Sequence, residues 1–413
     1  EFKVAMNRLG LGLTDEQLVQ CIEVLDKDGD GELNEAERDA LRDEFRRQFS
    51  RDRGGERSRR GGRSGRSRGG FGGSRKPTEE FQFVLISYDR NSGKEKWRSV
   101  ATTAVPHEGH HRDHGYASAS PVTDGENIIV SFGSRGLYCY DMKGKRLWSR
   151  DLGVQHHVWG NAASPVIHGN LCLFNFGPGA RTFLIAVSLT DGSTVWQHDE
   201  YGGNSGIPKE GAVRGEWIGS WTTPVFIEAK TGPQLLMTFP NRVVAFDPEK
   251  GRELWDCKGL NPLVYTSPVY GDGIVVAMGG FRGTAMGVRA GGKGDVTKTH
   301  LLWTRPREKQ RIGSGVMVNG HVYILNEDGV AQCIEARKGK VVWEERLRGP
   351  GGNGKSWSSM VSVGDKLYAI NLSGDAFILR AAPQYQLLAV NSLREMTQSS
   401  MAFSIGEIFV RTY

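Results

Sequence analysis

A tryptophan that recurs every 40 to 59 residues, in a chain with 56 glycines, predicts an all-β propeller over residues 78–413. Apolar residues at helical spacing predict a small α-helical module over residues 1–49. The stretch between them, residues 50–77, is rich in arginine and glycine and predicts a disordered linker. The sequence has no run of 18 apolar residues, which excludes a membrane-spanning helix.

The N-terminal module contains a predicted calcium site. Residues 26–37, DKDGDGELNEAE, fit the EF-hand pattern D-x-[DN]-x-[DN]-G-x5-E at every defining position. Because calcium is a hard cation that takes oxygen ligands, we expect six residues of this loop to surround it. The expected ligands are Asp26, Asp28, Asp30, Glu32 through its carbonyl, Asn34 through a water, and Glu37.

A second EF-hand is expected next to the first, because these loops normally occur in pairs. The stretch EFKVAMNRLGLGLTDEQLV resembles the segment between consecutive loops of calmodulin-like proteins. We therefore expect the preceding hand to have been cut off from this sequence. The chain starts with Glu rather than Met, so the absence of a signal peptide carries no information.

The linker carries most of the positive charge. Residues 46–76 hold 11 Arg and 1 Lys against 2 acidic residues, a balance of +10, whereas the whole chain has +6. This composition is similar to that of RNA-binding RGG tails, in which guanidinium groups contact phosphates and stack on bases. RNA is therefore one predicted partner of the linker. The alternative is a soluble spacer, because Phe71 is the only aromatic residue in it.

The propeller units share two signatures. Each of five units places a glycine four residues before its tryptophan, and these units end at Trp97, Trp148, Trp196, Trp255 and Trp343. Units open with a small residue and proline, as in ASPV from residue 119, and weaker copies begin at Ser314, Ser359 and Ser400. One four-stranded sheet cannot bury both of its faces, so we expect the sheets to stack around an axis with tryptophan between neighbours. The glycine would allow a tight reversal between the third and fourth strands.

The number of blades is left open by the sequence. Six full units lie between residues 115 and 393, with a half unit before them and another after them. If the two halves pair, the ring has seven blades. The alternative is a truncated eight-bladed ring.

These units resemble the tryptophan-docking repeats of pyrroloquinoline-quinone-like (PQQ-like) β-propellers, over roughly residues 80–413. The stretches GLNPLVYTSPVYGDGIVVAMGGF and GHVYILNEDGVAQCIE are similar to bacterial PQQ-binding-like repeat proteins. The resemblance implies an extracytoplasmic location, periplasmic or secreted. Quinoprotein alcohol dehydrogenases with a similar fold use two adjacent cysteines, and the five cysteines here are widely spaced. PQQ is therefore not expected as a cofactor, and Cys139, Cys172 and Cys333 are expected to be buried free thiols.

A second candidate metal or ligand site is a group of histidines ahead of two consecutive blades. Imidazole is a common ligand of transition metals, and both loops should emerge on the same face of the ring. The candidate residues are His107, His110, His111, His114, His156 and His157. The alternative interpretation is a set of solvated loop histidines.

Further polar and aromatic residues are expected on the same face, around the central funnel. They are Arg135, Arg181, Asn241, Arg242, Arg282, Asn326, Asp328, Trp217, Trp221 and Trp357. For each one, the alternative is a role in stabilising a turn or a seam between blades.

The sequence therefore predicts a calcium-binding, non-enzymatic scaffold whose propeller face binds a partner protein or a polysaccharide. The alternative is a metal- or quinone-dependent oxidoreductase that uses the funnel. No catalytic residue is predicted, and the sequence does not indicate an oligomeric state.

Overall fold

The computed structural model describes residues 77–111, 113–155, 159–179, 181–200, 219–280, 283–306 and 308–413. This part of the chain folds mainly as antiparallel strands, grouped into six consecutive sheets and a hairpin at each end. The prediction of an all-β propeller is confirmed. The predicted EF-hand module and nearly all of the predicted linker lie outside the described residues.

We number the six sheets as blades 1 to 6 in chain order. Blade 1 contains β3 (Val122–Thr123), β4 (Asn127–Ser131), β5 (Leu137–Asp141) and β6 (Arg146–Arg150). Blade 2 contains β7 (Val166–His168), β8 (Leu171–Phe176), β9 (Phe183–Ser188) and β10 (Thr194–Asp199). Blade 3 contains β12 (Val225–Ala229), β13 (Gly232–Phe239), β14 (Arg242–Phe246) and β15 (Glu253–Lys258).

Blades 4 to 6 repeat this arrangement. Blade 4 contains β17 (Val269–Gly271), β18 (Ile274–Met278), β19 (Ala285–Arg289) and β21 (Leu301–Arg305). Blade 5 contains β22 (Val316–Val318), β23 (His321–Leu325), β24 (Val330–Glu335) and β25 (Val341–Arg346). Blade 6 contains β26 (Val361–Val363), β27 (Lys366–Ile370), β28 (Asp375–Arg380) and β29 (Leu387–Ser392). In every blade the strands are hydrogen-bonded in chain order, so each blade is a simple meander.

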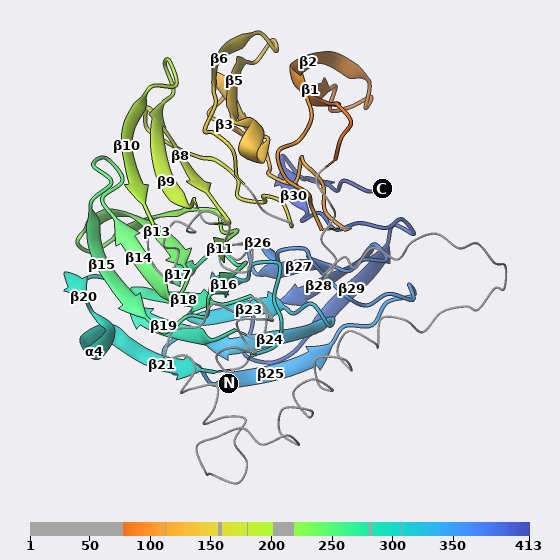
Figure 1. The fold of residues 1–413 in the computed structure, drawn as a ribbon. Coiled ribbons are helices and arrows are strands. Elements are labelled where there is room, and N and C mark those ends of the chain that lie inside the picture. The colour runs from red at the N-terminus through yellow and green to blue at the C-terminus, as the bar shows by residue number, and fades with distance from the viewer. Residues whose placement is uncertain are drawn as a thin grey trace, which may run out of the picture.

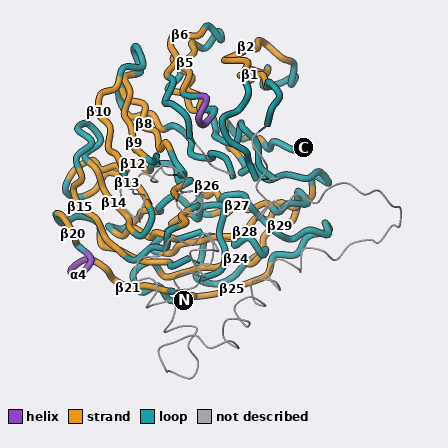
Figure 2. The backbone as a smooth tube through the Cα atoms, in the orientation of Figure 1, coloured by secondary structure: helices purple, strands orange, loops and turns teal. Residues whose placement is uncertain are grey.

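The blades surround a common centre, with first strands such as β17 and β26 towards the middle and fourth strands such as β21 and β25 at the periphery (Figures 1 and 2). A few short elements interrupt the repeat. They are η2 (Gly133–Arg135) in blade 1, the parallel pair β11 (Gly219–Ser220) and β16 (Leu263–Val264), and β20 (Gly294–Asp295) with α4 (Thr297–His300). β20 adds a fifth strand to blade 3 and lies in the connection that makes the unit of Trp303 longer than the others. Within the described residues, no helix is long and apolar enough to cross a membrane.

The two ends of the propeller meet. β1 (Phe81–Tyr88) pairs with β2 (Glu95–Ala104), and β30 (Ala402–Ser404) pairs with β31 (Glu407–Phe409), as two separate hairpins. Arg90, in the turn of the first hairpin, donates to the hydroxyl of Ser404 at 3.0 Å and forms an ion pair with Glu407 in the second. Its guanidinium also lies over the ring of Phe409, 5.1 Å from the centroid.

The contact between the terminal hairpins can be compared with a contact inside blade 2. There, the turn between the third and fourth strands contacts the turn between the first and second, with Leu189 N donating to Asn170 O at 2.9 Å. The terminal hairpins touch at the corresponding turns, so they occupy the two halves of one composite blade. This arrangement favours the seven-bladed alternative.

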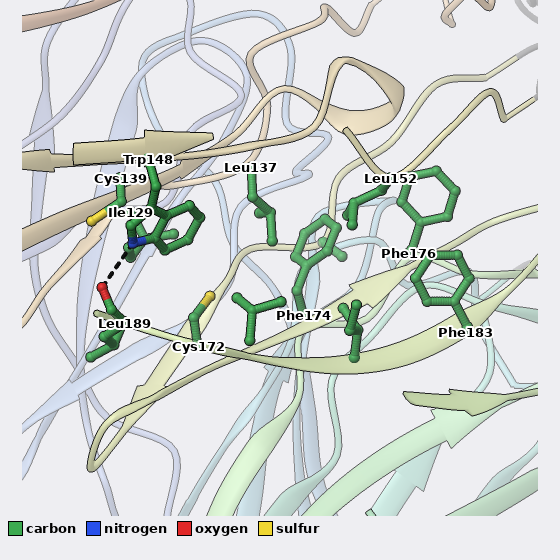
Figure 3. Packing of buried hydrophobic residues seen from close by; sticks show 13 residues of the cluster. Ile129, Leu137, Cys139, Trp148, Leu152, Cys172, Phe174, Phe176, Phe183 and Leu189 are labelled. Carbon is green, nitrogen blue, oxygen red and sulfur yellow. Dashed lines mark hydrogen bonds between the residues drawn. The ribbon is translucent and has the colours of Figure 1, made fainter. Parts of the chain in front are cut away.

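Tryptophan joins neighbouring blades. The indole of Trp148, in blade 1, donates to the carbonyl of Leu189, in blade 2, at 2.8 Å (Figure 3). Its ring lies on Gly192, where a Cβ atom would stand 2.6 Å from Trp148 Cε3. Gly192 also has φ +72°, in the left-handed region. The glycine of the repeat is therefore required both by the turn and by the tryptophan of the preceding blade.

The same joint recurs around the ring. Equivalent indole-to-carbonyl bonds are Trp97 to Met142 at 3.2 Å, Trp196 to Pro248 at 2.9 Å, Trp303 to Ala336 at 2.8 Å, and Trp343 to Ala382 at 3.2 Å. Trp255 differs, because its indole donates within its own blade to Gln234 at 3.1 Å. Apolar side chains of blades 1 and 2 form one buried cluster with Trp148, which extends through Phe174 to Phe176 and Phe183 at its far end (Figure 3).

A second joint runs along the inner ends of the blades, and we call it the hydroxyl seam. In each unit, the backbone N–H of a Ser or Thr donates to the side-chain hydroxyl of the corresponding residue in the next unit, at 2.9 to 3.0 Å. The seam runs in order through Ser120, Ser164, Thr223, Ser267, Ser314, Ser359 and Ser400. The small residue before proline in the sequence signature is therefore the hydroxyl that links one blade to the next.

The described cysteines are free and buried. Burial raises the pKa of the Cys139 and Cys172 thiols to about 12, and that of Cys257 and Cys333 to about 11. The predicted buried thiols at Cys139, Cys172 and Cys333 are confirmed. All four are protonated at neutral pH and pack as small apolar residues.

Candidate functional site

The turns between second and third strands and the connections between blades emerge on one face, because the strands of each meander alternate in direction. We call this the loop face. Its described connections are residues 105–111, 113–121, 151–155, 159–165, 219–224, 259–268, 308–315 and 347–360. Both predicted histidine loops belong to it. The backbone N–H of His111 donates to the carbonyl of Trp159 at 3.2 Å, which places the first loop beside the second.

Four of the predicted histidines lie in the described part of the first loop. His107 Nδ1 lies 3.2 Å from the hydroxyl of Ser134, and His110 Nδ1 lies 2.7 Å from the carbonyl of His111. His111 Nδ1 accepts from the backbone N–H of Asp113 at 3.2 Å. His156 and His157 lie outside the described residues.

The surroundings of the His114 imidazole shift its pKa strongly. Burial, together with the neighbouring His110 and His111, lowers its pKa to about 4, so its imidazole is neutral at pH 7. Its Nδ1 is buried and has no hydrogen-bond partner in the part of the chain that the structure describes. Among the described residues, however, no three of these histidines bring ring nitrogens within 4.8 Å of one another.

A buried carboxyl anchors this loop. Glu108 accepts hydrogen bonds from Asn161 at 3.0 Å and from the hydroxyl of Ser134. Burial raises its pKa above the usual range, although both hydrogen bonds act in the opposite direction. Because its oxygens are held by two neighbouring loops, Glu108 fixes the histidine loop against blade 1 and the next connection. Sequence reasoning passed over Glu108, which stands inside the histidine cluster.

Aromatic side chains from five connections gather on the loop face, and we call them the aromatic cluster. They are His111, Trp159, Trp221, Tyr265 and Trp357, and each is partly exposed. The ring centroids of Trp159 and Trp221 are 5.9 Å apart, those of Trp221 and Tyr265 are 5.2 Å apart, and those of His111 and Trp357 are 5.3 Å apart. These separations are within the usual range for interacting aromatic rings.

The cluster is held in position by the backbone. The indole of Trp221 donates to the carbonyl of Gly160 at 2.9 Å, one residue beyond Trp159. The short parallel strands β11 and β16 immediately precede Trp221 and Tyr265, so pairing of these strands sets the two side chains next to each other. Backbone contacts of the propeller itself therefore hold these rings in position.

The sequence prediction found part of this cluster. Trp221 and Trp357 belong to it as expected, and Trp217 lies outside the described residues. Tyr265 and Trp159 were missed. A repeat signal was present for one of them, because Trp221, Tyr265 and Trp357 all stand two residues before a member of the hydroxyl seam.

Some of the polar residues predicted on the loop face have hydrogen-bond or ion-pair partners in the structure, and others have no ion-pair partner among the described residues. Arg242 donates to Glu200 at 2.7 Å and to Glu253 at 2.8 Å, and Asn326 is buried within its own turn. Asp328 forms an ion pair with Lys309 at 3.4 Å. The backbone N–H of Asn241 donates to Asn261 O at 3.2 Å. These four stabilise turns and seams, whereas Arg282 lies outside the described residues, and Arg135 and Arg181 have no ion-pair partner among the described residues.

Around Arg242, the structure brings together a group that the sequence did not indicate. Ligand atoms of His198, Glu200 and Glu253 lie within 4.8 Å of one another. Burial raises the pKa of Glu200, but hydrogen bonds from His198 and Arg242 outweigh it and hold that pKa below its usual value. Because the guanidinium already lies between the two carboxylates, we interpret the group as an ion-pair network between blades 2 and 3 rather than a metal centre.

The described residues form a tryptophan-docked β-propeller with aromatic side chains on its loop face. Residues 82–256 and 239–383 match the family described as outer membrane protein assembly factor BamB, and the chain belongs to this family.

Solved structures of similar fold have different activities. BamB from Moraxella catarrhalis is 15% identical, with a TM-score of 0.56 over 80% of this chain and 85% of that one. A europium-containing methanol dehydrogenase is 11% identical, with a TM-score of 0.56 over 78% of this chain and 77% of that one. No curated protein sequence matches the chain. At these identities the likeness shows the fold alone, so function has to be argued from the site.

Proposed function

We propose that this chain is an extracytoplasmic, non-enzymatic binding protein whose aromatic cluster holds a segment of a partner protein. The observation that carries the proposal is the convergence of five partly exposed aromatic side chains, from five separate connections, on one face. Aromatic residues are enriched at the centres of protein interfaces, where they contribute much of the binding energy. The description of the family as an assembly factor agrees with such a role.

The chemistry of the face also supports binding over catalysis. The one strongly buried carboxyl in the described histidine loop, Glu108, is occupied by Ser134 and Asn161. The adjacent cysteine pair of the similar quinoprotein dehydrogenases does not occur in the sequence. The face thus offers large, preset apolar contacts rather than an arranged acid, base or nucleophile.

The test compares two tryptophan variants with a matched aromatic control. Trp221→Ala and Trp357→Ala remove members of the cluster, whereas Tyr88→Ala removes an exposed aromatic next to the turn of the first hairpin, away from the loop face. A partner captured from an envelope extract and then purified should bind the wild type and the Tyr88 variant equally. Each tryptophan variant should bind at least tenfold more weakly. Equal binding by all three variants would refute the proposal.

Two other outcomes would replace the proposal of a protein partner. Binding of a defined polysaccharide with the same dependence on Trp221 and Trp357 would identify a carbohydrate-binding face. A stoichiometric transition metal that is lost on replacing His110, His111 and His157 would identify the oxidoreductase alternative. Elemental analysis of the purified full chain decides the second point.

We further propose that the EF-hand of residues 26–37 binds calcium. Its pattern is the support, because bidentate coordination by the last glutamate of the loop completes the oxygen shell. Calorimetric titration of the full chain should show saturable calcium binding that Glu37→Gln abolishes. Glu35→Gln, at a loop position that supplies no ligand, is the control and should bind as the wild type does. Unchanged binding by the Glu37 variant would contradict the assignment.

A further inference from the structure

A cleft between blades 1 and 2 has the features of an anion site. It opens beside the end of β6 and the turn before β9, and its volume is about 300 Å³. Arg150, Arg181 and Gln197 contribute polar side chains to its wall. None of the residues so far assigned to the aromatic cluster or the EF-hand lines it.

Neither arginine in the cleft has a carboxylate partner among the described residues. The Nη2 of Arg150 donates to the hydroxyl of Thr194 at 2.9 Å, but its Nε is buried and has no hydrogen-bond partner. Arg181 is an exposed residue and donates through Nη1 to the carbonyl of Leu152. Neither guanidinium group in the cleft wall is therefore neutralised by an acidic side chain among the described residues.

Blade 4 has an arginine at the equivalent position and shows an acceptor for its Nε. Arg305, in blade 4, stands two residues after its tryptophan, as Arg150 does, and donates to the turn of the next blade through Gly339 at 2.8 Å. Its Nε, however, donates to the carboxylate of Glu308 at 2.5 Å. Three residues after Arg150, the equivalent position is Gly153, which has no carboxylate. Blade 1 thus keeps the arginine and lacks its internal anion.

The second arginine is held in a fixed orientation. The guanidinium carbon of Arg181 lies 5.1 Å from the centroid of the Phe183 ring and 5.6 Å from that of Phe176. Stacking of this kind sets the plane of the donor fork before a ligand arrives. Asp151 also lines the cleft, but its carboxylate accepts from the backbone N–H of Gly153 at 2.7 Å. The two arginines and this single acid leave the cleft with a net positive charge.

We propose that Arg150 and Arg181 bind an anionic oxygen group, either a carboxylate or a phosphate, in this cleft. The ligand oxygens accept from guanidinium N–H groups of these two arginines, as the carboxylate of Glu308 accepts from Arg305 in blade 4. This site goes beyond the proposed function, because it requires neither the aromatic cluster nor calcium. Guanidinium groups suit both anions because their paired N–H donors match two oxygens at once.

The experiment is a titration of the full chain at low ionic strength, with acetate and inorganic phosphate as separate probes and chloride as the reference. Saturable binding of one probe is expected, and the probe that binds identifies the source as carboxylate or phosphate. Arg150→Gln and Arg181→Gln should each weaken it at least tenfold. Arg337→Gln removes the same charge from an exposed position in the turn before β25, on the opposite face, and should leave binding unchanged.

Two results would overturn the site. One is the absence of saturable binding by either probe, and the other is an equal loss of binding in the Arg337 variant, which would indicate a general charge effect. Arg181 is exposed, so its replacement tests the site even if the Arg150 variant fails to fold. Because the Trp221 and Trp357 variants leave this cleft intact, they should bind the probe normally. Failure of the partner-binding proposal is therefore distinguishable from failure of this one.

Discussion

The joint between blades can be tested at a single glycine. Gly192 combines φ +72° with the indole of Trp148, whose Cε3 would stand 2.6 Å from an added Cβ atom. Gly93 occupies the equivalent turn of the first hairpin with φ +67°, and an added Cβ would meet nothing within 4 Å. The two positions therefore share the backbone conformation and differ in their neighbours, which at Gly192 are the indole of Trp148 and, at 3.2 Å, Cγ of Arg150.

The expected magnitudes follow from this difference. Placing alanine in the left-handed region costs about 1–2 kcal/mol, and the reduced freedom of the unfolded chain offsets about 0.5–1 kcal/mol of it. Gly93→Ala should therefore lower the free energy of unfolding by about 1 kcal/mol. Overpacking against a buried ring costs a further 1–3 kcal/mol or so, which gives about 2–4 kcal/mol for Gly192→Ala.

Urea unfolding of both variants, followed by tryptophan fluorescence, measures these losses. A third protein, Gly192→Ala combined with Trp148→Leu, should recover most of the overpacking term, because leucine leaves room for the new methyl group. With Trp148→Leu measured alone to complete the cycle, the coupling between positions 148 and 192 should be about 1 kcal/mol or more. Equal losses in Gly93→Ala and Gly192→Ala, or zero coupling, would show that the glycine serves the turn alone.

Two further predictions concern titration and the hydroxyl seam. The pKa of His114 is lowered to about 4, so protons bind the unfolded chain more tightly than the folded one. The free energy of unfolding should therefore fall by about 3 kcal/mol as the pH drops from 6.5 to 4. His114→Gln should remove this slope in pH-dependent unfolding. Ser267→Ala should cost about 1–2 kcal/mol in urea unfolding, because the N–H of Thr223 loses its acceptor, whereas Ser120→Ala, whose hydroxyl accepts no seam bond, should cost nothing measurable. A flat pH profile for the wild type, or equal losses in the two serine variants, would contradict these assignments.

The fold could be predicted because each repeat contains short sequence motifs whose residues are close together in the chain. A glycine four residues before a tryptophan marks each reversal, and the small residue before proline marks each inner strand. The structure adds a physical reason that the spacing alone did not supply. The tryptophan of the preceding blade packs on the glycine and leaves no room for a side chain there. The insertion of β20 and α4 was visible only as an unusually long unit ending at Trp303.

The site was less predictable because its contacts join residues far apart in the chain. His198 and Glu253 come from different units, and no local pattern indicates that Arg242 lies between Glu200 and Glu253. The histidine loop was found, but the directions of its ring nitrogens depend on backbone hydrogen bonds that composition does not reveal. Trp221 and Trp357 were expected, whereas Tyr265 follows a signal that only becomes meaningful once the hydroxyl seam is known.

The hydroxyl seam has a consequence for how such rings change over time. Every unit carries both the donor and the acceptor of the seam bond, so this bond can form between any two consecutive units. Duplication or loss of one unit would therefore leave the seam chemically unchanged, whereas the tryptophan joint and the Arg242 network differ from one boundary to the next. Blade number is therefore a property of closure, decided where the terminal hairpins meet at Arg90. A family with this joint can vary its size while the individual blade stays the same.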